Sequence, residues 1–220
     1  ARERWLTRAE AAQLLRAAWR AKDRLTGRPM GRHVARFILV ALYTGTRASA
    51  VCQAALRPIE GQAFVDVERG VFYRRPSGEI ETKKRRPPVV LPERLRAHIW
   101  RWVDKGIARD FVVEWNGKPV GSVRKGFESA AKTAGLGKDV TPHVLRHTAA
   151  TWLMQNGVDP FEAAGFLGMS TQMLLERYGH HHPDHQREAA KAITRPPPFR
   201  HRLGRMEPEQ TVANLRIDSK

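Results

Sequence analysis

The stretch that decides the fold begins at His143-Val144-Leu145-Arg146 and closes with the run Leu167-Gly168-Met169-Ser170-Thr171-Gln172-Met173-Leu174-Leu175-Glu176-Arg177-Tyr178. A third element, Thr44-Gly45-Thr46-Arg47, lies far upstream in the same chain. Two arginines, a histidine and a tyrosine in this chain order suit the attack of a phenol on a phosphodiester. The sequence therefore predicts a phosphoryl-transfer site built from residues that are distant in the chain.

Arg47 and Arg146 are the candidate phosphate-binding residues. The transition state of such an attack places extra negative charge on the non-bridging oxygens, and a guanidinium is planar, always charged and bidentate. In so basic a chain, a single arginine is more often a solvated surface group or a non-specific phosphate contact. Both arginines, however, follow apolar helical segments and belong to motifs, which favours the catalytic interpretation.

His143 and Tyr178 complete the predicted chemistry. His143 precedes Arg146 by one helical turn, so both are expected on one face of a helix, and imidazole can take or give a proton near neutral pH. Tyr178 is the candidate nucleophile because Tyr43 and Tyr73 lie in an apolar helix and a strand. A phenol has a pKa near 10, which two nearby arginines are expected to lower. The structural alternatives are a capping or core histidine and an aromatic anchor of the chain end.

Several histidines raise the question of a metal site. His147 forms an H-x-x-x-H pair with His143, and residues 180–182 form a histidine tract with His185. The pair lacks the glutamate of a zinc-protease helix, and consecutive histidines cannot all face one ion without an irregular backbone. Cys52 is the only cysteine, so there is no Cys-based zinc site and no disulfide framework. The sequence predicts no metal and no other cofactor.

Together these motifs resemble those of the tyrosine recombinases, the phage-type integrases, from about Trp5 to Ile193. The resemblance implies a mainly helical catalytic domain in which Tyr178 attacks the scissile phosphate, forms a 3′-phosphotyrosine and releases a 5′-hydroxyl. The energy of the broken bond is kept in the new one, so no nucleotide cofactor is needed. The resemblance also implies a homo-tetramer on two synapsed duplexes, with a monomer allowed in the absence of DNA.

The same resemblance places a general-acid lysine in the segment 81–92. The count back from the terminal proline lands on Lys84, with Lys83 as the alternative, and a plain phosphate-contacting loop would explain the run equally. Two positions depart from the family pattern. Met169 stands where a histidine is usual, so one phosphate contact is lost or taken up by the histidine tract. Ala50 stands where an acidic residue is usual, which puts in doubt how Arg47 is held.

The charge of the chain points to a polyanionic partner. The sequence has 39 Lys and Arg against 22 Asp and Glu, a formal net charge of +17, with a pI of about 11.1. Such a balance favours nucleic acid, here double-stranded DNA. No apolar run approaches the roughly 20 residues of a membrane span, and no signal peptide opens the chain, so a cytoplasmic location is expected, nucleoid-associated or encoded by a phage or mobile element. The candidate DNA contacts are Lys83, Arg85, Arg86, Arg124 and Lys125.

Helical patterns dominate the chain, and they predict a mainly α fold with a small three-stranded antiparallel β-sheet. Thr7-Arg8-Ala9-Glu10 is a capping box that opens the first helix. Strands are expected at 64–67, 71–73 and 89–91. Further helices are expected at 37–43, 47–56, 93–104, 123–133, 141–157, after Asp159 and after Ser170, with an amphipathic stretch at 184–193.

The predicted domain organisation is a catalytic domain over residues 1–194 and a C-terminal tail over 195–220. The tail follows Pro196-Pro197-Pro198, which cannot continue a helix, and the resemblance suggests that it docks on a neighbouring protomer. The abrupt start at Ala1 predicts that an upstream core-binding domain has been removed.

Two other functions remain open at this point. The first is a non-catalytic DNA-binding protein that keeps the scaffold, which Met169 and Ala50 support. The second is DNA relaxation like that of a type IB topoisomerase, which uses the same chemistry. The motif spacings fit the integrases better.

Overall fold

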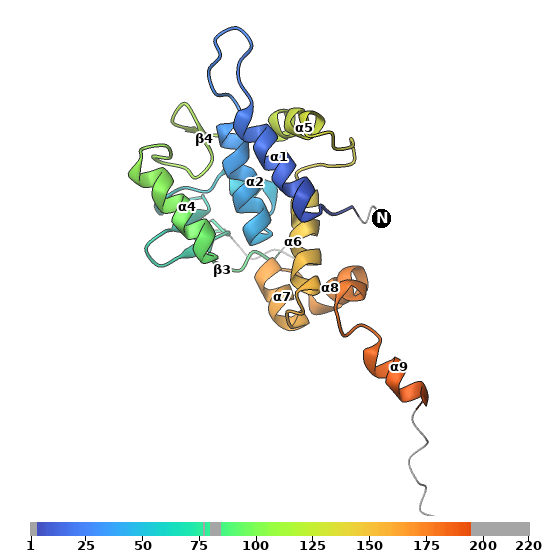
Figure 1. Cartoon of the computed structure of the whole chain (residues 1–220). Coiled ribbons are helices and arrows are strands. Elements are labelled where there is room, and N and C mark those ends of the chain that lie inside the picture. Colours follow the sequence, from blue (N-terminus) through green and yellow to red (C-terminus); the bar gives the residue numbers. More distant parts are fainter. Residues whose placement is uncertain (1–3, 77, 80–84, 195–220) are drawn as a thin grey trace, which may run out of the picture. The chain divides into compact units, whose positions relative to one another are not determined.

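The computed structural model describes residues 4–76, 78–79 and 85–194, and it confirms the mainly α fold with a small antiparallel sheet (Figure 1). Lys83, Lys84 and the tail 195–220, on which several predictions rest, lie outside the described residues. The helices are α1 (Arg8–Arg20), α2 (Arg32–Thr44), α3 (Ala48–Cys52), α4 (Glu93–Asp104), α5 (Arg124–Thr133), α6 (Val144–Gln155), α7 (Pro160–Leu167), α8 (Thr171–Tyr178) and α9 (Arg187–Thr194), with a 3₁₀ turn η1 (Gly179–His181).

Helix α2 is the centre of the core. Its side chains Phe37, Ile38 and Val40 are fully buried, as the apolar run predicts, although the helix begins earlier than expected, at Arg32. Helices α1 and α6 both pack against it. The capping box at the start of α1 is confirmed, because Thr7 accepts from the backbone of Glu10 while the Glu10 carboxylate accepts from the backbone of Thr7.

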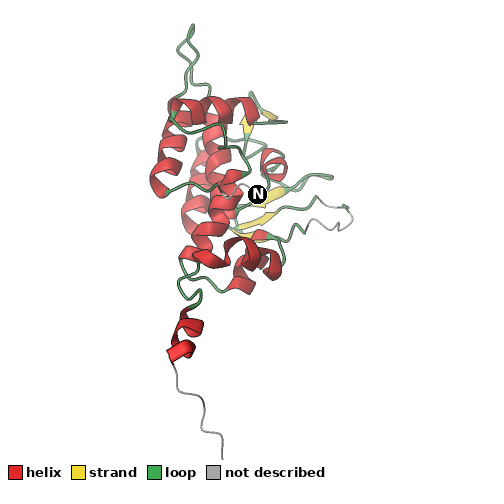
Figure 2. Ribbon diagram, turned by 90° about the vertical axis from the view of Figure 1, so that its right-hand side faces the viewer, coloured by secondary structure: helices red, strands yellow, loops and turns green. Residues whose placement is uncertain are grey.

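The predicted three-stranded sheet is confirmed in position and direction (Figure 2). Strand β1 (Phe64–Asp66) pairs antiparallel with β2 (Val71–Tyr73), which pairs antiparallel with β3 (Val89–Val90). Phe72 on the middle strand is fully buried, and Phe64 stacks on Tyr73 across the first pair at 4.6 Å between ring centroids. The loop between β2 and β3 therefore leaves the sheet close to Tyr73.

A second hairpin was not predicted. Strand β4 (Glu114–Trp115) pairs with β5 (Lys118–Pro119) through the two-residue turn Asn116-Gly117, where both residues have positive φ, 51° and 74°. An Asn-Gly pair is a strong signal for such a turn, but the strands on either side are only two residues long. The buried guanidinium of Arg36 anchors this hairpin by donating to the carbonyl oxygens of Ile107 and Glu114.

Two predicted helices have other limits in the structure. The helix expected from 47 to 56 ends at Cys52, because the backbone of Ala55 instead bonds to Ala63 and Val65. The helix expected from Thr141 begins at Val144, with His143 as its N-cap, and Thr141 makes no side-chain cap. The predicted caps of α7 and α8 are confirmed, since Asp159 and Ser170 each accept from backbone amides in the first turn.

The chain divides into two compact units, residues 1–185 and 186–220. The first unit contains every element from α1 to η1. Of the second unit, the structure describes α9, which confirms the amphipathic helix expected near 184–193. The assignment of residues 1–194 as a catalytic domain remains a prediction. No helix among the described residues is long and apolar enough to cross a membrane.

Candidate active site

Arg47 lies at the N-cap of α3, directly after the turn that ends α2. Its guanidinium Nη1 donates to the carbonyl oxygen of Arg85 at 3.1 Å, in the loop between β2 and β3. This contact answers the question raised by Ala50, because a backbone carbonyl, in place of a carboxylate, orients the guanidinium. The turn itself requires glycine: Gly45 has φ +60°, and a Cβ there would lie 2.3 Å from Leu167 Cδ2.

Arg146 is the most strongly anchored of the predicted site residues. Its side chain is 6% exposed, and Nη1 donates to the carbonyl oxygens of Gly45 at 2.7 Å and Leu167 at 2.6 Å. One guanidinium thus joins the turn after α2 to the end of α7. Burial, and next the positive charge of Arg47, lower the pKa of Arg146 to about 10, so it remains charged at neutral pH.

A third arginine of this site, Arg74, is buried and was not identified from the sequence. It is 3% exposed and donates to the carbonyl oxygens of Pro87 at 2.7 Å and Phe166 at 2.8 Å. Burial, then Arg146, then Arg47 lower its pKa to about 9. The alternation of side chains along a strand could have indicated that Arg74 is buried. It follows the buried Phe72 by two residues and therefore faces the same side of the sheet.

We call Arg47, Arg74 and Arg146 the guanidinium cluster. Among the described residues, all of the hydrogen bonds from these three side chains go to backbone carbonyl oxygens, and none forms an ion pair with an acidic side chain. The mutual effect of the three charges on their pKa values shows that they interact. Buried charges without counter-charges are costly, so the cluster is electrostatically prepared for an anion.

Tyr178 ends α8 with its hydroxyl against His147, not against the predicted His143. The hydroxyl oxygen lies 2.5 Å from His147 Nδ1, and the tyrosine is 7% exposed. The expected lowering of the tyrosine pKa is wrong: burial raises it, and this effect outweighs the opposing charges of Arg146 and Arg177. The spacing of His147 to His143 suggests only a metal-binding pair, so the contact of His147 with the Tyr178 hydroxyl does not follow from the sequence.

His143 lies on the solvent side of the pair formed by His147 and Tyr178. Its ring meets the ring of His147 edge to face at 4.6 Å between centroids, so that one side of His143 is covered while the rest of the residue is exposed to solvent. His143 and Arg146, which are expected on one helix face, therefore have different surroundings. The Arg146 side chain points into the core, whereas that of His143 points toward solvent. Burial, then the charges of Arg146, Arg47 and Arg177, lower the pKa of His143, which favours its neutral form.

The other predicted site residues that the structure describes are Met169, Arg85, Arg86, Arg124 and Lys125, and none of their side chains belongs to the guanidinium cluster. Met169 is half-buried and packs on the apolar cluster formed by the ends of α6, α7 and α8. Arg85 and Arg86 belong to the β2–β3 loop, where Arg86 pairs with Glu79 at 2.7 Å. Arg124 and Lys125 begin α5 on the surface, and Arg124 pairs with Glu128 at 2.8 Å.

The histidine tract does not assemble a metal site among the residues that the structure covers. His181 packs edge-on against Trp5, at 5.8 Å between ring centroids, and His182 Nδ1 accepts from the backbone of Asp184. No group of three His, Cys, Asp or Glu side chains in the described part of the chain is placed to hold an ion.

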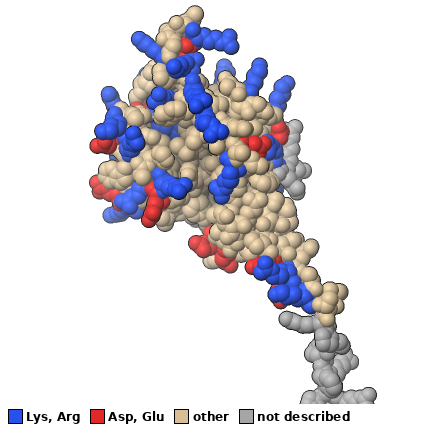
Figure 3. All heavy atoms as spheres, in the orientation of Figure 1, with Lys and Arg blue, Asp and Glu red and all other residues tan. Residues whose placement is uncertain are grey.

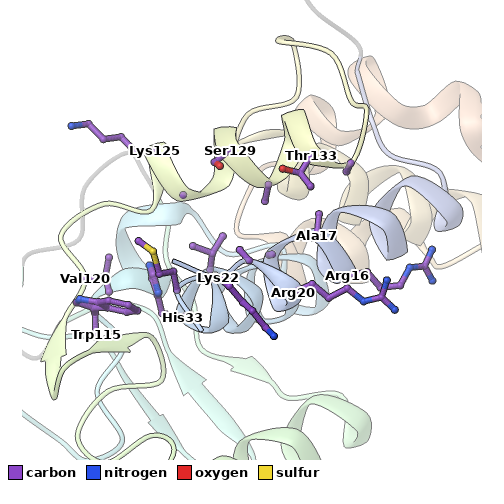
Figure 4. Close-up of a pocket in the computed structure, with 18 of the residues that line it drawn as sticks. Arg16, Ala17, Arg20, Lys22, His33, Trp115, Val120, Lys125, Ser129 and Thr133 are labelled. Atoms are coloured by element: carbon purple, nitrogen blue, oxygen red, sulfur yellow. The ribbon is translucent and has the colours of Figure 1, made fainter. Parts of the chain in front are cut away.

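A large hollow lies at the other end of α2 from Arg47, between α1, α5 and the β4–β5 hairpin. This basic groove, of about 1280 Å³, has five Lys and Arg and no Asp or Glu among the residues that line it: Arg16, Arg20, Lys22, Lys118 and Lys125. Figure 4 shows Ser129 and Thr133 on α5 turned toward α1, with Trp115 and His33 side by side at one end. Lys and Arg also gather over α5 and the segment 21–31 in Figure 3.

Comparison with known proteins agrees with the geometry: the chain belongs to the phage integrase family, whose sequence profile matches residues 4–185. Tyrosine recombinase XerD of Staphylococcus saprophyticus is 31% identical over 157 residues, which cover 66% of this chain and 49% of that protein. The chain thus spans about half of this relative, and about a fifth of XerC and XerD relatives matched over shorter stretches.

Solved structures show the same fold. The Tn1549 transposon integrase (residues 82–397), in complex with circular intermediate DNA, matches with a TM-score of 0.64 and 22% identity, over 88% of this chain and 68% of that one. The catalytic domain of bacteriophage HP1 integrase matches with a TM-score of 0.54 and 21% identity, over 85% of this chain and 93% of that one. The fold is therefore that of a tyrosine recombinase catalytic domain.

Proposed function

We propose that this chain is the catalytic domain of a site-specific DNA recombinase that cleaves and rejoins DNA through a covalent 3′-phosphotyrosine at Tyr178. The observation that carries the proposal is the position of Tyr178 beside a guanidinium cluster without acidic partners among the described residues. In water-excluded surroundings, such charges stabilise the extra negative charge that develops on the phosphate during attack.

Each member of the site has a distinct proposed task. Arg47 and Arg146 hold the non-bridging oxygens of the scissile phosphate, and His143, exposed on the solvent side, contacts the incoming backbone. Lys84, or Lys83 in its place, protonates the departing 5′-oxygen; both lie outside the described residues. Arg74 has its donors on the carbonyls of Pro87 and Phe166, so it keeps the β2–β3 loop against the end of α7.

The proposed partner is double-stranded DNA, bound by a homo-tetramer when two sites are brought together. Support comes from the net charge of +17 and from the basic groove, which is lined by Lys125 from α5 and by Arg16 and Arg20 from α1. Lys and Arg side chains that contact several DNA phosphates supply the electrostatic part of the affinity for DNA. Lys125 lines this groove, and we assign further DNA contacts to Arg124 beside it at the start of α5 and to Arg85 and Arg86 in the β2–β3 loop. We assign docking on a neighbouring protomer to the segment after Pro198.

A nicked duplex tests the proposal. Cleavage near a nick releases a short strand, which diffuses away and leaves the protein joined to DNA. We expect a protein–DNA band that survives SDS, absent in Tyr178→Phe, which loses one hydroxyl and keeps the ring. Duplexes for the assay are selected from a random pool by binding to the wild-type chain.

The outcomes separate the competing functions. Binding of DNA without any covalent band would support a non-catalytic DNA-binding protein and would refute the recombinase proposal. Covalent attachment with relaxation of supercoiled DNA, but no exchange between two duplexes, would indicate activity like that of a type IB topoisomerase.

A further inference from the structure

We propose that His147 is the general base that accepts the phenolic proton of Tyr178 during attack on DNA. The inference rests on the proposed function and deepens it. It is carried by the contact between His147 Nδ1 and the Tyr178 hydroxyl oxygen, 2.5 Å apart and shielded between α6 and α8. A base must reach the proton that it removes, and this distance is within hydrogen-bond reach.

The direction of the hydrogen bond follows from the number of protons available. The phenol carries one proton, and His147 Nδ1 is its hydrogen-bond partner among the described residues. If Nδ1 carried the proton, the phenolic proton would be left without an acceptor on a side chain that is 7% exposed. The neutral imidazole therefore carries its proton on Nε2 and accepts through Nδ1.

The surroundings keep His147 neutral and the phenol protonated until DNA arrives. Burial, followed by His143, Arg177 and Arg146, lowers the pKa of His147 to about 4, so the ring is free to accept at neutral pH. Burial also raises the pKa of Tyr178. Both effects oppose transfer of the proton ahead of the reaction. The transfer is therefore coupled to formation of the bond to phosphorus, and the tyrosine stays unreactive without substrate.

His143 is the alternative base, and the geometry disfavours it. It lies at the exposed N-cap of α6, one turn before His147, and contacts the ring of His147 and not the hydroxyl of Tyr178. The two rings meet edge to face, so His143 limits the rotation of His147 and holds Nδ1 toward the tyrosine. This arrangement makes His143 a positioning residue for the base and leaves its own outer edge for DNA.

The step balances without any further reactant. The Tyr178 oxygen forms a bond to phosphorus, its proton passes to His147 Nδ1, and the bond from phosphorus to the 5′-oxygen breaks. The departing oxygen takes a proton from the general acid proposed above. In the rejoining step a 5′-hydroxyl attacks phosphorus and returns its proton to the same general acid, while the imidazolium returns its proton to the tyrosine oxygen as that bond breaks.

The first test needs no DNA. In the ¹⁵N-labelled full chain, we expect His147 at pH 7 to be neutral with the proton on Nε2, and to titrate near pH 4. His147→Gln identifies the signal and is of similar size, and the ¹³Cζ signal of Tyr178, assigned with Tyr178→Phe, should shift in the same variant. A proton on Nδ1 would overturn the proposal, because His147 would then donate to the phenol.

The second test is chemical rescue on the nicked duplex. His147→Gln and His147→Ala should bind DNA like the wild type, but form the SDS-stable band at least about a hundredfold more slowly. Free imidazole should restore the His147→Ala rate and have no effect on Tyr178→Phe, a result that a packing role would not produce. A wild-type rate in His147→Gln would overturn the proposal, as would a folded, DNA-binding His147→Ala that imidazole does not rescue.

These outcomes are distinct from failure of the proposed function. If the wild-type chain forms no covalent band on any duplex, the recombinase proposal fails. If the wild type forms the band and His147→Gln matches it, only the role of His147 fails. Should His147→Ala not fold, as judged by its melting curve, His147→Gln and the tautomer measurement decide.

Discussion

Filling the guanidinium cluster with an anion should stabilise the folded chain measurably. The pKa of Arg146 is lowered from 12.5 to about 10, and that of Arg74 to about 9. A pKa that is lower in the folded state means that the folded chain disfavours the charged form. The buried charges therefore lower the free energy of unfolding. This loss is present in full at every pH below about 9, and it shrinks only as the pH rises above that value.

The size of the effect follows from these pKa values. At about 1.4 kcal/mol for each pKa unit, the charged form costs roughly 3 kcal/mol at Arg146 and roughly 5 kcal/mol at Arg74. An anion offsets the repulsion and part of the burial cost, so we expect it to recover about a third, on the order of 2–3 kcal/mol. In a domain of this size each kcal/mol moves the melting temperature by about 2–4 °C, which gives a rise of about 5–10 °C.

The assay is a thermal melt of the chain with a short duplex or with sulfate, against sodium chloride at equal ionic strength. Because sulfate also stabilises proteins by exclusion from their surface, the matched controls are Arg146→Met, which removes a member of the cluster, and Arg57→Ala, whose exposed guanidinium pairs with Asp110. The rise should be lost in the first variant and kept in the second. An equal rise in wild type and Arg146→Met would refute the electrostatic reasoning.

Three further outcomes are expected. Arg47→Ala or Arg146→Ala should slow covalent complex formation by at least about a hundredfold, with only partial rescue by lysine, because an ammonium cannot make a two-pronged contact; an unchanged rate would reduce that arginine to a mere phosphate contact. Gly45→Ala should lower the free energy of unfolding by about 2–4 kcal/mol in a denaturant titration. Gly27→Ala, which has a similar φ but open space around it, should cost only about 1–2 kcal/mol, and equal losses at both positions would contradict the clash with Leu167. Log affinity for DNA should fall with log salt at about −0.9 per phosphate contacted, and Lys125→Ala should reduce the slope by about one such contact, whereas a flat salt response would argue against DNA as the partner.

Much of the fold could be predicted from local patterns. The capping box at Thr7, the strands around Phe72, and the caps Asp159 and Ser170 are short-range signals, and each is confirmed. The β4–β5 hairpin was missed because strands of two residues carry no readable alternation. The end of α3 at Cys52 was missed because long-range pairing of Ala55 with the sheet competes with helix propensity.

The site could be predicted in its residues but not in its contacts. Motif spacing identified Arg47, Arg146 and Tyr178 as candidates, and the structure brings Arg47 and Arg146 together. The neighbour of Tyr178 could not be deduced, because whether His143 or His147 reaches the hydroxyl depends on how α8 packs on α6. The sign of the tyrosine pKa shift failed for a related reason: spacing reveals nearby charges but not the burial that outweighs them.

The anchoring of the arginines on main-chain oxygens has a consequence for how this protein can change over time. The acceptors for the guanidinium cluster are carbonyl groups of residues such as Gly45, Pro87 and Leu167, and every amino acid carries such a group. Replacement of a neighbouring side chain therefore leaves these anchors in place, provided that the backbone keeps its path. Residues near the cluster, such as Met169 and Ala50, can then vary while the three guanidinium groups keep the anchors that hold them in place.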